Sequence, residues 1–86
     1  MAAADDTHLL ERLLKGEQQA YKELVTTYQS AMRAVAYAIV GQRHADEVVQ
    51  DAWLSVVRNV ARFEGRSSLK TWLLTITANA AKGRYK

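Results

Sequence analysis

The chain has 86 residues with no cysteine, no proline and only four glycines, and its formal net charge is +3. The absence of cysteine excludes disulfide bonds and thiolate metal sites, and no apolar stretch approaches the roughly 20 residues that cross a bilayer. A chain of this length forms one domain at most, so residues 1–86 are predicted to be a single unit that does not insert into a membrane.

The two ends of the chain carry opposite charge. Residues 1–57 hold five Lys or Arg against eight Asp or Glu, whereas residues 58–86 hold seven Lys or Arg against one Glu. A basic end favours a polyanion and an acidic end favours a basic partner, although mixed surface charge for solubility explains the same counts. The N-terminus lacks the basic start of a signal peptide, and the absence of cysteine suits a reducing compartment, so we expect a cytoplasmic protein.

The hydrophobic periodicity predicts four helices and no strand. The first helix is expected over residues 7–15, begun by Asp5 or Asp6 and stopped by Gly16. The second is expected over residues 17–40, where apolar residues recur every three or four positions. Those apolar positions are Ala20, Tyr21, Leu24, Val25, Tyr28, Ala31, Met32, Val35 and Ile39.

The third helix is expected over residues 45–62, with Asp46 and Glu47 in its first turn, where acids suit the helix dipole. The fourth is expected over residues 68–84, capped by Ser68 or the serine before it. The buried stripes are predicted to be Val49, Ala52, Trp53, Val56, Val57 and Val60 on the third helix, and Leu69, Trp72, Leu73, Ile76 and Ala80 on the fourth. Short links imply antiparallel neighbours, so the predicted fold is a compact, monomeric all-α bundle of about four helices.

Two helix faces remain outside the predicted core. On the third helix, an acidic and amide strip with one leucine recurs at i, i+3, i+4 and i+7: Glu47, Gln50, Asp51 and Leu54. A solvated helix face usually looks like this, but a leucine between acids also fits a docking face for a basic helical partner. On the fourth helix, the outer side chains are small, hydroxyl, amide and ammonium groups, which suit a nucleic-acid strand better than a core: Lys70, Thr71, Thr75, Ala78, Asn79 and Lys82.

Catalysis is not expected. His8 and His44 lie far apart, neither has a His or Cys at ligand spacing, and the four glycines lie singly rather than in a phosphate-binding loop. We therefore predict that the protein is not an enzyme and has no catalytic residue, metal or cofactor.

Four segments resemble region 2 of bacterial RNA polymerase sigma factors, above all the compact extracytoplasmic-function (ECF) group. They are residues 46–54 (DEVVQDAWL), 63–73 (FEGRSSLKTWL), 76–82 (ITANAAK) and, similar to the opening of that group, 13–28 (LLKGEQQAYKELVTTY). The resemblance covers nearly the whole chain with the segments in the right order. It implies an all-α fold and a role in initiating and regulating transcription.

The resemblance assigns a partner to each face. It implies that Glu47, Gln50, Asp51 and Leu54 dock on the clamp coiled coil in the largest subunit of the RNA polymerase core, where basic side chains would meet the acids. It also implies that the loop and the fourth helix open promoter DNA at the minus-ten element and hold the non-template single strand. The DNA-binding residues so implied are Phe63, Gly65, Arg66, Ser67, Ser68, Lys70, Thr71, Thr75, Asn79, Lys82, Arg84 and Lys86.

Within that set, the resemblance implies that some residues bind a base and others bind phosphates. The loop from Phe63 to Ser68 would form a pocket for an unstacked base together with Asn79, whose amide both donates and accepts. The lysines and Arg84 would meet phosphates, which add affinity but carry little sequence information. Trp72 lies on the apolar face and is interpreted either as a core residue or as a platform for a base.

Two features depart from the family pattern. Members often carry a basic residue near Thr75 or Ala78, and this chain has none there. The second domain of such factors, the helix-turn-helix region 4 that reads the upstream promoter element, has no counterpart, so the chain alone is not expected to direct promoter-specific transcription. Two alternatives stay open: a sigma-like interaction module that mainly binds an anti-sigma factor, with little intrinsic DNA binding, and a helical bundle without a specific ligand.

Overall fold

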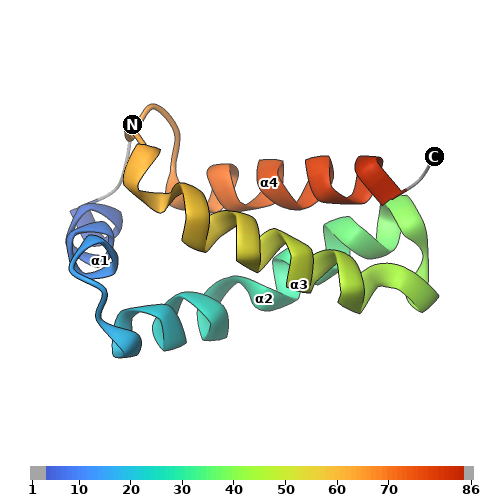
Figure 1. Cartoon of the computed structure of the whole chain (residues 1–86), viewed down its shortest axis with the longest axis horizontal. Coiled ribbons are helices and arrows are strands. Elements are labelled where there is room, and N and C mark those ends of the chain that lie inside the picture. The colour runs from blue at the N-terminus through green and yellow to red at the C-terminus, as the bar shows by residue number, and fades with distance from the viewer. Residues whose placement is uncertain (1–3, 85–86) are drawn as a thin grey trace.

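The computed structural model describes the backbone of residues 4–84 and the side chains from residue 7 to residue 84. These residues form four α-helices and one short 3-10 helix with no strand among them, which confirms the all-α prediction (Figure 1). The elements are α1 (Ala4–Leu14), α2 (Gln18–Val40), α3 (Gln42–Asn59), η1 (Val60–Arg62) and α4 (Leu69–Arg84). None of the described helices is both long enough and apolar enough to cross a membrane.

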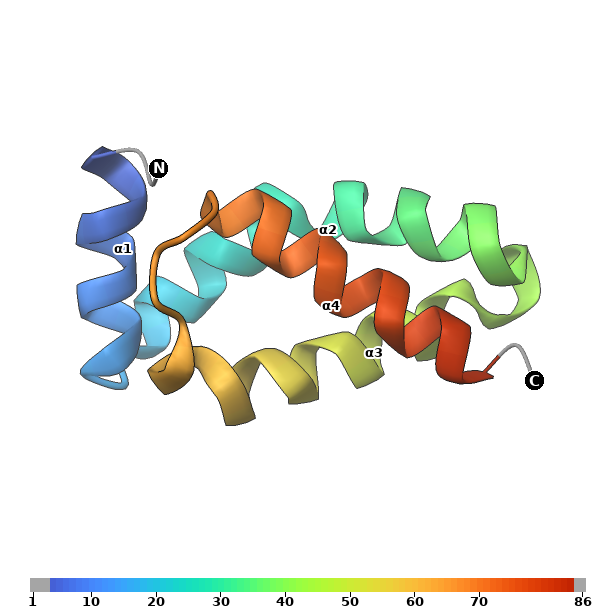
Figure 2. The same cartoon turned by 90° about the horizontal axis from the view of Figure 1, so that it is seen from above.

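Three helices make the body of the molecule. α2, α3 and α4 follow one another in alternating directions, and each contacts the other two. α1 stands across one end of this bundle, against α2 and η1 (Figure 2). The longest dimension is 35 Å, which is the length of a 23-residue helix such as α2 at about 1.5 Å per residue.

The start of α3 differs from the prediction. The helix begins at Gln42, three residues early, because Gly41 has a φ of 82° and reverses the chain within a single residue. Asp46 and Glu47 therefore lie in the second turn, and the predicted pairing of these acids with the start of the helix is wrong, since no acid lies in the first turn. α3 also ends early, at Asn59, and the last predicted turn is the 3-10 helix η1.

α1 is longer at its start than predicted. It begins at Ala4, so the two aspartates predicted as caps lie inside its first turn, and it ends before Gly16, as expected. Arg12 joins α1 to α2, because its side chain donates to Glu23 at 2.6 Å and to Glu17 at 3.2 Å. The bond to Glu23 raises the pKa of the Arg12 guanidinium, and the same bond lowers the pKa of the Glu23 carboxyl. These two bonds help to hold α1 across the end of the bundle.

The core consists of small and aliphatic side chains. The buried hydrophobic residues are Leu13, Ala20, Leu24, Met32, Ala36, Ala45, Val48, Val49, Ala52, Val56, Val60, Leu69, Leu73 and Ala81. On α3, the predicted stripe is correct except at its edges: Val48 is buried, Trp53 is only half-buried and Val57 is exposed. Val57 would be buried only if a further helix or loop packed against that side of α3, and the described part of the chain has none there.

The buried stripe of α4 is rotated from the predicted one. Leu69 and Leu73 are buried as expected, and the stripe continues through Thr77 and Ala81. The other predicted members are only half-buried: Trp72, Ile76 and Ala80. Thr77 can lie in the core because its hydroxyl donates to the carbonyl oxygen of Leu73 at 2.8 Å. The rotation brings Trp72 to the boundary between core and surface.

The start of α4 confirms the predicted serine cap. The backbone N–H of Thr71 donates to the Ser68 hydroxyl oxygen at 3.1 Å, and the Ser68 hydroxyl lies 3.0 Å from that of Thr71. This bond occupies one of the helical N–H groups that have no partner within the helix. The cap thereby sets the point where the 63–68 loop ends and α4 begins.

Replacing Ser68 by Ala should destabilise the domain by about 1 kcal/mol, the usual effect of a lost N-cap. For a domain of this size, the melting temperature should fall by about 4–8 °C. Thermal unfolding followed by circular dichroism measures this change. Ser67→Ala is the matched control, because the Ser67 hydroxyl donates to the carbonyl oxygen of Ser68 and, among the described residues, caps no N–H of α4. Equal shifts in the two variants would show that the cap is not the stabilising contact.

Candidate partner-binding and nucleic-acid surfaces

The predicted docking strip on α3 is exposed along its whole length. Glu47, Gln50, Asp51 and Leu54 all lie on the surface, and Leu54 keeps 55% of its area exposed. Val57, one turn further on, is 56% exposed, so we include it in what we call the α3 strip. The strip therefore has an acidic half and an apolar half, which combines charge for orientation with apolar area for affinity.

Arg84, a predicted phosphate ligand, lies against the acidic half of the α3 strip. Its Nη1 is 3.0 Å from Oε2 of Glu47, and its Nε donates to Oδ2 of Asp51 at 3.3 Å. The three side chains keep 42%, 55% and 49% of their surfaces exposed, respectively. These ion pairs join the C-terminal end of α4 to the first ten residues of α3 while remaining open to water.

The loop of residues 63–68 borders a small hollow. Gly65 has a φ of 74°, a conformation that glycine adopts without strain. The rings of Phe63 and Trp72 have centroids 4.9 Å apart with planes tilted by 42°, a favourable aromatic contact. Beside them lies a hollow of about 210 Å³, which we call the loop hollow, lined by Arg62, Phe63, Glu64, Arg66, Ser67 and Trp72.

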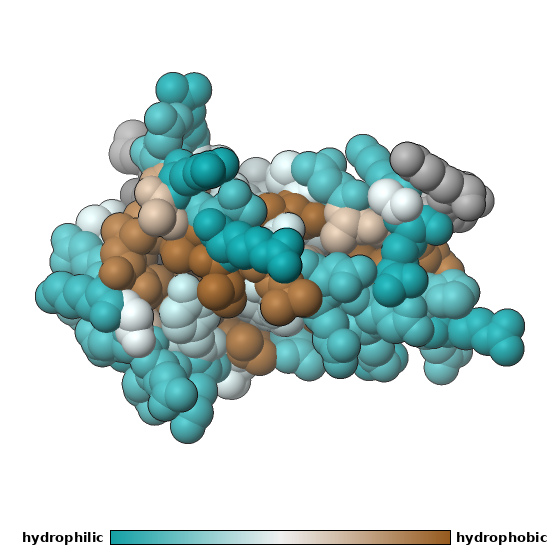
Figure 3. Space-filling view, in the orientation of Figure 1, coloured by the Kyte–Doolittle hydropathy of each residue, from teal (hydrophilic) through white to brown (hydrophobic). Residues whose placement is uncertain are grey.

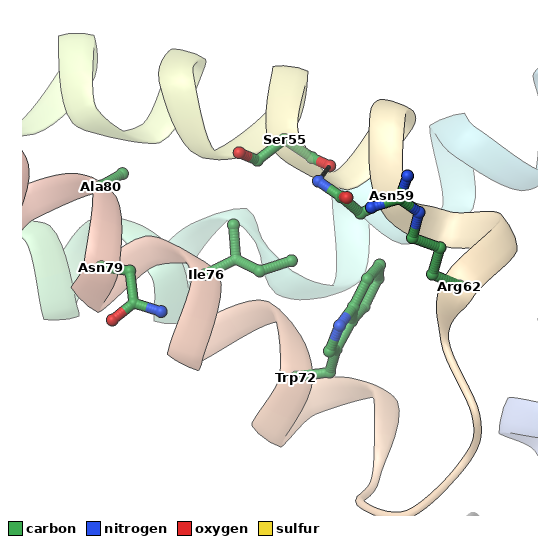
Figure 4. A pocket seen from close by; sticks show the side chains of 7 residues that line it. All are labelled: Ser55, Asn59, Arg62, Trp72, Ile76, Asn79 and Ala80. Atoms are coloured by element: carbon green, nitrogen blue, oxygen red, sulfur yellow. Dashed lines mark hydrogen bonds between the residues drawn. The ribbon is translucent and has the colours of Figure 1, made fainter.

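A larger groove separates α3 and η1 from α4. It measures about 520 Å³ and is lined by Ser55, Asn59, Arg62, Trp72, Ile76, Asn79 and Ala80 (Figure 4). In Figure 4 the indole of Trp72 rises from α4 towards the opposite wall, and Asn79 lies at the α4 edge. Asn59 is held in place because its amide nitrogen donates to the carbonyl oxygen of Ser55 at 2.8 Å. We call this space the α3–α4 groove.

The loop hollow and the α3–α4 groove share two residues. Trp72 and Arg62 line both spaces. An aromatic face therefore borders each space, with a guanidinium beside it and the amides of Asn59 and Asn79 further along the groove. An aromatic ring stacks on a planar group, a guanidinium meets an anion, and an amide both donates and accepts. Together these groups match the base and phosphate of a nucleotide.

The structure brings together only part of the predicted DNA-binding set. Phe63, Arg66 and Ser67 line the loop hollow, and Asn79 lines the groove. Gly65 shapes the loop without lining either space. Four residues of the predicted polar face lie exposed on α4 outside both spaces: Lys70, Thr71, Thr75 and Lys82. The Thr75 hydroxyl donates to the carbonyl of Thr71 at 2.8 Å, Ser68 is engaged in the cap, and Lys86 lies outside the described residues.

Sequence reasoning missed the opposite wall of the groove. Ser55, Asn59 and Arg62 come from α3 and η1, and none of them was singled out in the sequence. A signal was present, because these three polar residues recur at i, i+4 and i+7 beside the apolar stripe of α3. Ile76, predicted to be a core residue, instead lines the groove and is half-buried.

Some of the charged side chains near the two spaces are already in ion pairs. Glu64 pairs with Arg66 at 3.1 Å in the loop, and Arg84 pairs with acids of α3. Arg62 is the described cation that lines both spaces.

In the view of Figure 3, apolar surface gathers over the part nearer α1, and the surface towards the C-terminal end of α4 is hydrophilic. Among the side chains that the structure describes, residues 7–84, no three His, Cys, Asp or Glu are grouped so that they could hold a metal ion.

Comparison with known proteins points to one family. A family model described as Sigma-70 region 2 matches residues 24–86. The ECF RNA polymerase sigma-E factor of Haemophilus influenzae is 32% identical over 77 residues, which cover 90% of this chain and 41% of the relative. The sigma-E factors of Escherichia coli K12 and Salmonella typhimurium LT2 are 36% and 35% identical over the same share of this chain. The chain spans about 40% of the length of these curated relatives.

Proposed function

The chain belongs to the Sigma-70 region 2 family, and on that premise we propose that it acts in transcription initiation by binding RNA polymerase and promoter DNA. The α3 strip docks on the clamp coiled coil of the polymerase. The loop hollow and the α3–α4 groove hold the non-template strand of an opened minus-ten element. Both events take place in the cytoplasm, where the polymerase works.

The observation that carries the proposal is the position of Trp72 between two adjoining spaces. A base that leaves the duplex loses a few kcal/mol of stacking and pairing free energy, and binding in a protein pocket must offset that loss. Stacking on an aromatic side chain contributes about 1–3 kcal/mol per base. Because Trp72 is half-buried and contacts Phe63, it can pack against the core with one part and stack with another. Its two predicted roles are therefore compatible.

The α3 strip supports the polymerase half of the proposal. Its acids, Glu47 and Asp51, are exposed at one end, and its apolar residues, Leu54 and Val57, are exposed at the other. A basic coiled coil with an apolar seam would match both halves. Charge of this kind mainly sets the orientation and rate of encounter, and the apolar half contributes more to affinity.

Titrating the domain with a short fluorescent single-stranded oligonucleotide, and separately with the polymerase clamp coiled coil, tests the proposal. We expect weak binding to the oligonucleotide that weakens further with added salt, because phosphate contacts release counterions. We also expect binding to the coiled coil in the absence of DNA. Coiled-coil binding without any DNA binding would favour the interaction module that serves an anti-sigma factor. Failure of both would contradict the proposal.

A further inference from the structure

The wall of the α3–α4 groove opposite Trp72 carries two polar side chains to which the proposed function assigns no individual role. Asn59 is the last residue of α3, and Arg62 is the last residue of η1. Both line the groove together with Trp72, and Figure 4 shows the indole directed at the part of the wall that carries them. A planar group that stacks on Trp72 would therefore present its edge to Asn59 and Arg62.

The amide of Asn59 is oriented by its own helix. Its nitrogen donates to the carbonyl oxygen of Ser55, one turn earlier, at 2.8 Å, and this bond is partly buried. The bond engages Nδ2, so the amide oxygen Oδ1 is the end that a ligand in the groove can use. Among the described residues, no donor bonds to that oxygen. Asn59 thus supplies the groove with a hydrogen-bond acceptor on an oriented amide.

The guanidinium of Arg62 is available to a ligand. It forms no ion pair with any described residue, unlike Arg66, which pairs with Glu64. The turn that carries Arg62 is closed by the backbone N–H of Phe63, which donates to the carbonyl oxygen of Val60 at 3.1 Å. Arg62 thus supplies a fork of N–H donors from a hydrogen-bonded turn, three residues after the acceptor at the end of α3.

A fork of donors beside an acceptor matches the edge of guanine. Guanine presents two adjacent acceptors, O6 and N7, and an arginine fork on this pair is the commonest specific contact between a protein and a base. Beyond O6, guanine carries the N1–H and the N2 amine, which are donors that Oδ1 of Asn59 can accept. Pairing with cytosine occupies these donors in a duplex. The arrangement therefore suits a guanine in a single strand.

The other bases fit this wall less well. Adenine has an amine where guanine has O6, so the donors of Arg62 would meet another donor. Its N1 is an acceptor, which would face Oδ1 of Asn59, and polar groups left unpaired at a contact weaken binding. Cytosine and thymine have a single ring and stack over less of the Trp72 indole. Of the two purines, only guanine satisfies both side chains.

We propose that Arg62 and Asn59 select a guanine at the position of the strand that stacks on Trp72. The inference rests on the proposed function and specifies which base this part of the groove accepts. Arg62 binds O6 and N7, and Asn59 accepts a hydrogen bond from N1 or from the N2 amine. Because Arg62 is exposed, the preference should lie at the lower end for a bidentate contact, about five- to tenfold.

The test uses thymine oligonucleotides that carry guanine, adenine, cytosine or 7-deazaguanine at one central position, titrated against the domain at one fixed salt concentration. The guanine strand should bind about five- to tenfold more tightly than the adenine strand. In 7-deazaguanine a C–H replaces N7 and removes one of the two bonds to Arg62. That strand should therefore lose most of the advantage of guanine.

Arg62→Lys separates base selection from charge. Lysine keeps the positive charge but not the fork, so this variant should bind the four strands about equally and keep the salt dependence of the wild type. Arg58→Lys is the matched control, because Arg58 is exposed four residues earlier and lines neither the groove nor the loop hollow. The control should keep the preference for guanine.

Asn59→Ala tests the acceptor by itself. The ratio between the guanine and adenine strands should fall, but 7-deazaguanine should still bind more weakly than guanine, because O6 and N7 remain bound to Arg62. Circular dichroism checks that loss of the bond to Ser55 has not unfolded the end of α3. An unchanged ratio in Asn59→Ala would overturn the part assigned to Asn59.

Failure of guanine selection differs from failure of the function beneath it. Salt-dependent binding without a preference for guanine would overturn the selection and leave strand binding in place. A preference that Arg62→Lys retains, with all four affinities shifted in parallel, would show that Arg62 binds only phosphate. Absence of binding to every strand in the wild type would overturn the proposed function, and guanine selection with it.

Discussion

Reversing the charges of Glu47 and Asp51 to Lys will weaken binding to the polymerase clamp coiled coil by a factor on the order of 100. Like charges brought together at an interface cost several kcal/mol, and each 1.4 kcal/mol is a tenfold change in affinity. Both side chains are exposed on α3, so the helical content of the domain should not change. Binding measured by calorimetry at low and high salt, with circular dichroism as a check, tests the expectation.

Asp46→Lys is a control for that double reversal, because it makes one of the same kind of charge reversal on the same helix. Asp46 lies on the same helix next to the α3 strip but pairs with Arg33 of α2. If the strip docks on the polymerase, the control should bind nearly as well as the wild type. A double reversal that binds as tightly as the control would mean that the α3 strip is merely solvated.

Replacing Asn79 by Ala should reduce discrimination between bases by about 1–3 kcal/mol, if its amide makes a bidentate contact with a base edge. Asn79 lines the same α3–α4 groove as Trp72, two turns further along α4, so it is placed to reach a base in that groove. An ammonium group responds only to charge, whereas an amide responds to a pattern of donors and acceptors. Lys82→Gln should therefore lower affinity about equally for every sequence and reduce the salt dependence.

A panel of short oligonucleotides that differ at one position, titrated against both variants and the wild type, measures this distinction. Asn79→Ala should bring the affinities of the panel closer together, and Lys82→Gln should shift them in parallel. A parallel shift in Asn79→Ala would show that this residue supports α4 and does not read a base.

Features set by neighbouring residues were predictable from the sequence. The Ser68 cap depends on a hydroxyl three residues before a backbone N–H, and the α3 strip depends on helical spacing alone, so both were found. The start of α3 was missed because a four-residue link between α2 and α3 was assumed. A single glycine with a positive φ, Gly41, is enough to connect the two helices.

Features set by packing between helices were not predictable. Thr77 was not counted among the buried residues of α4, yet it lies in the core with its hydroxyl bonded within the helix. The packed face of α4 is therefore rotated from the predicted one, and Trp72 reaches the surface. The far wall of the α3–α4 groove comes from Asn59 and Arg62, which meet α4 only once the bundle is packed. Arg84 finds Asp51 across 33 positions of sequence, a pairing that no local pattern signals.

Strand capture is tested most directly with single-stranded and duplex oligonucleotides of the same sequence, each titrated against the domain bound to the clamp coiled coil. Binding to the single strand should be tighter, because only an unstacked base can reach Trp72 and Asn79. The logarithm of that affinity should fall linearly with the logarithm of salt concentration, with a slope of about −0.7 per phosphate contact. Equal or tighter binding to the duplex would contradict strand capture by the loop hollow and the α3–α4 groove.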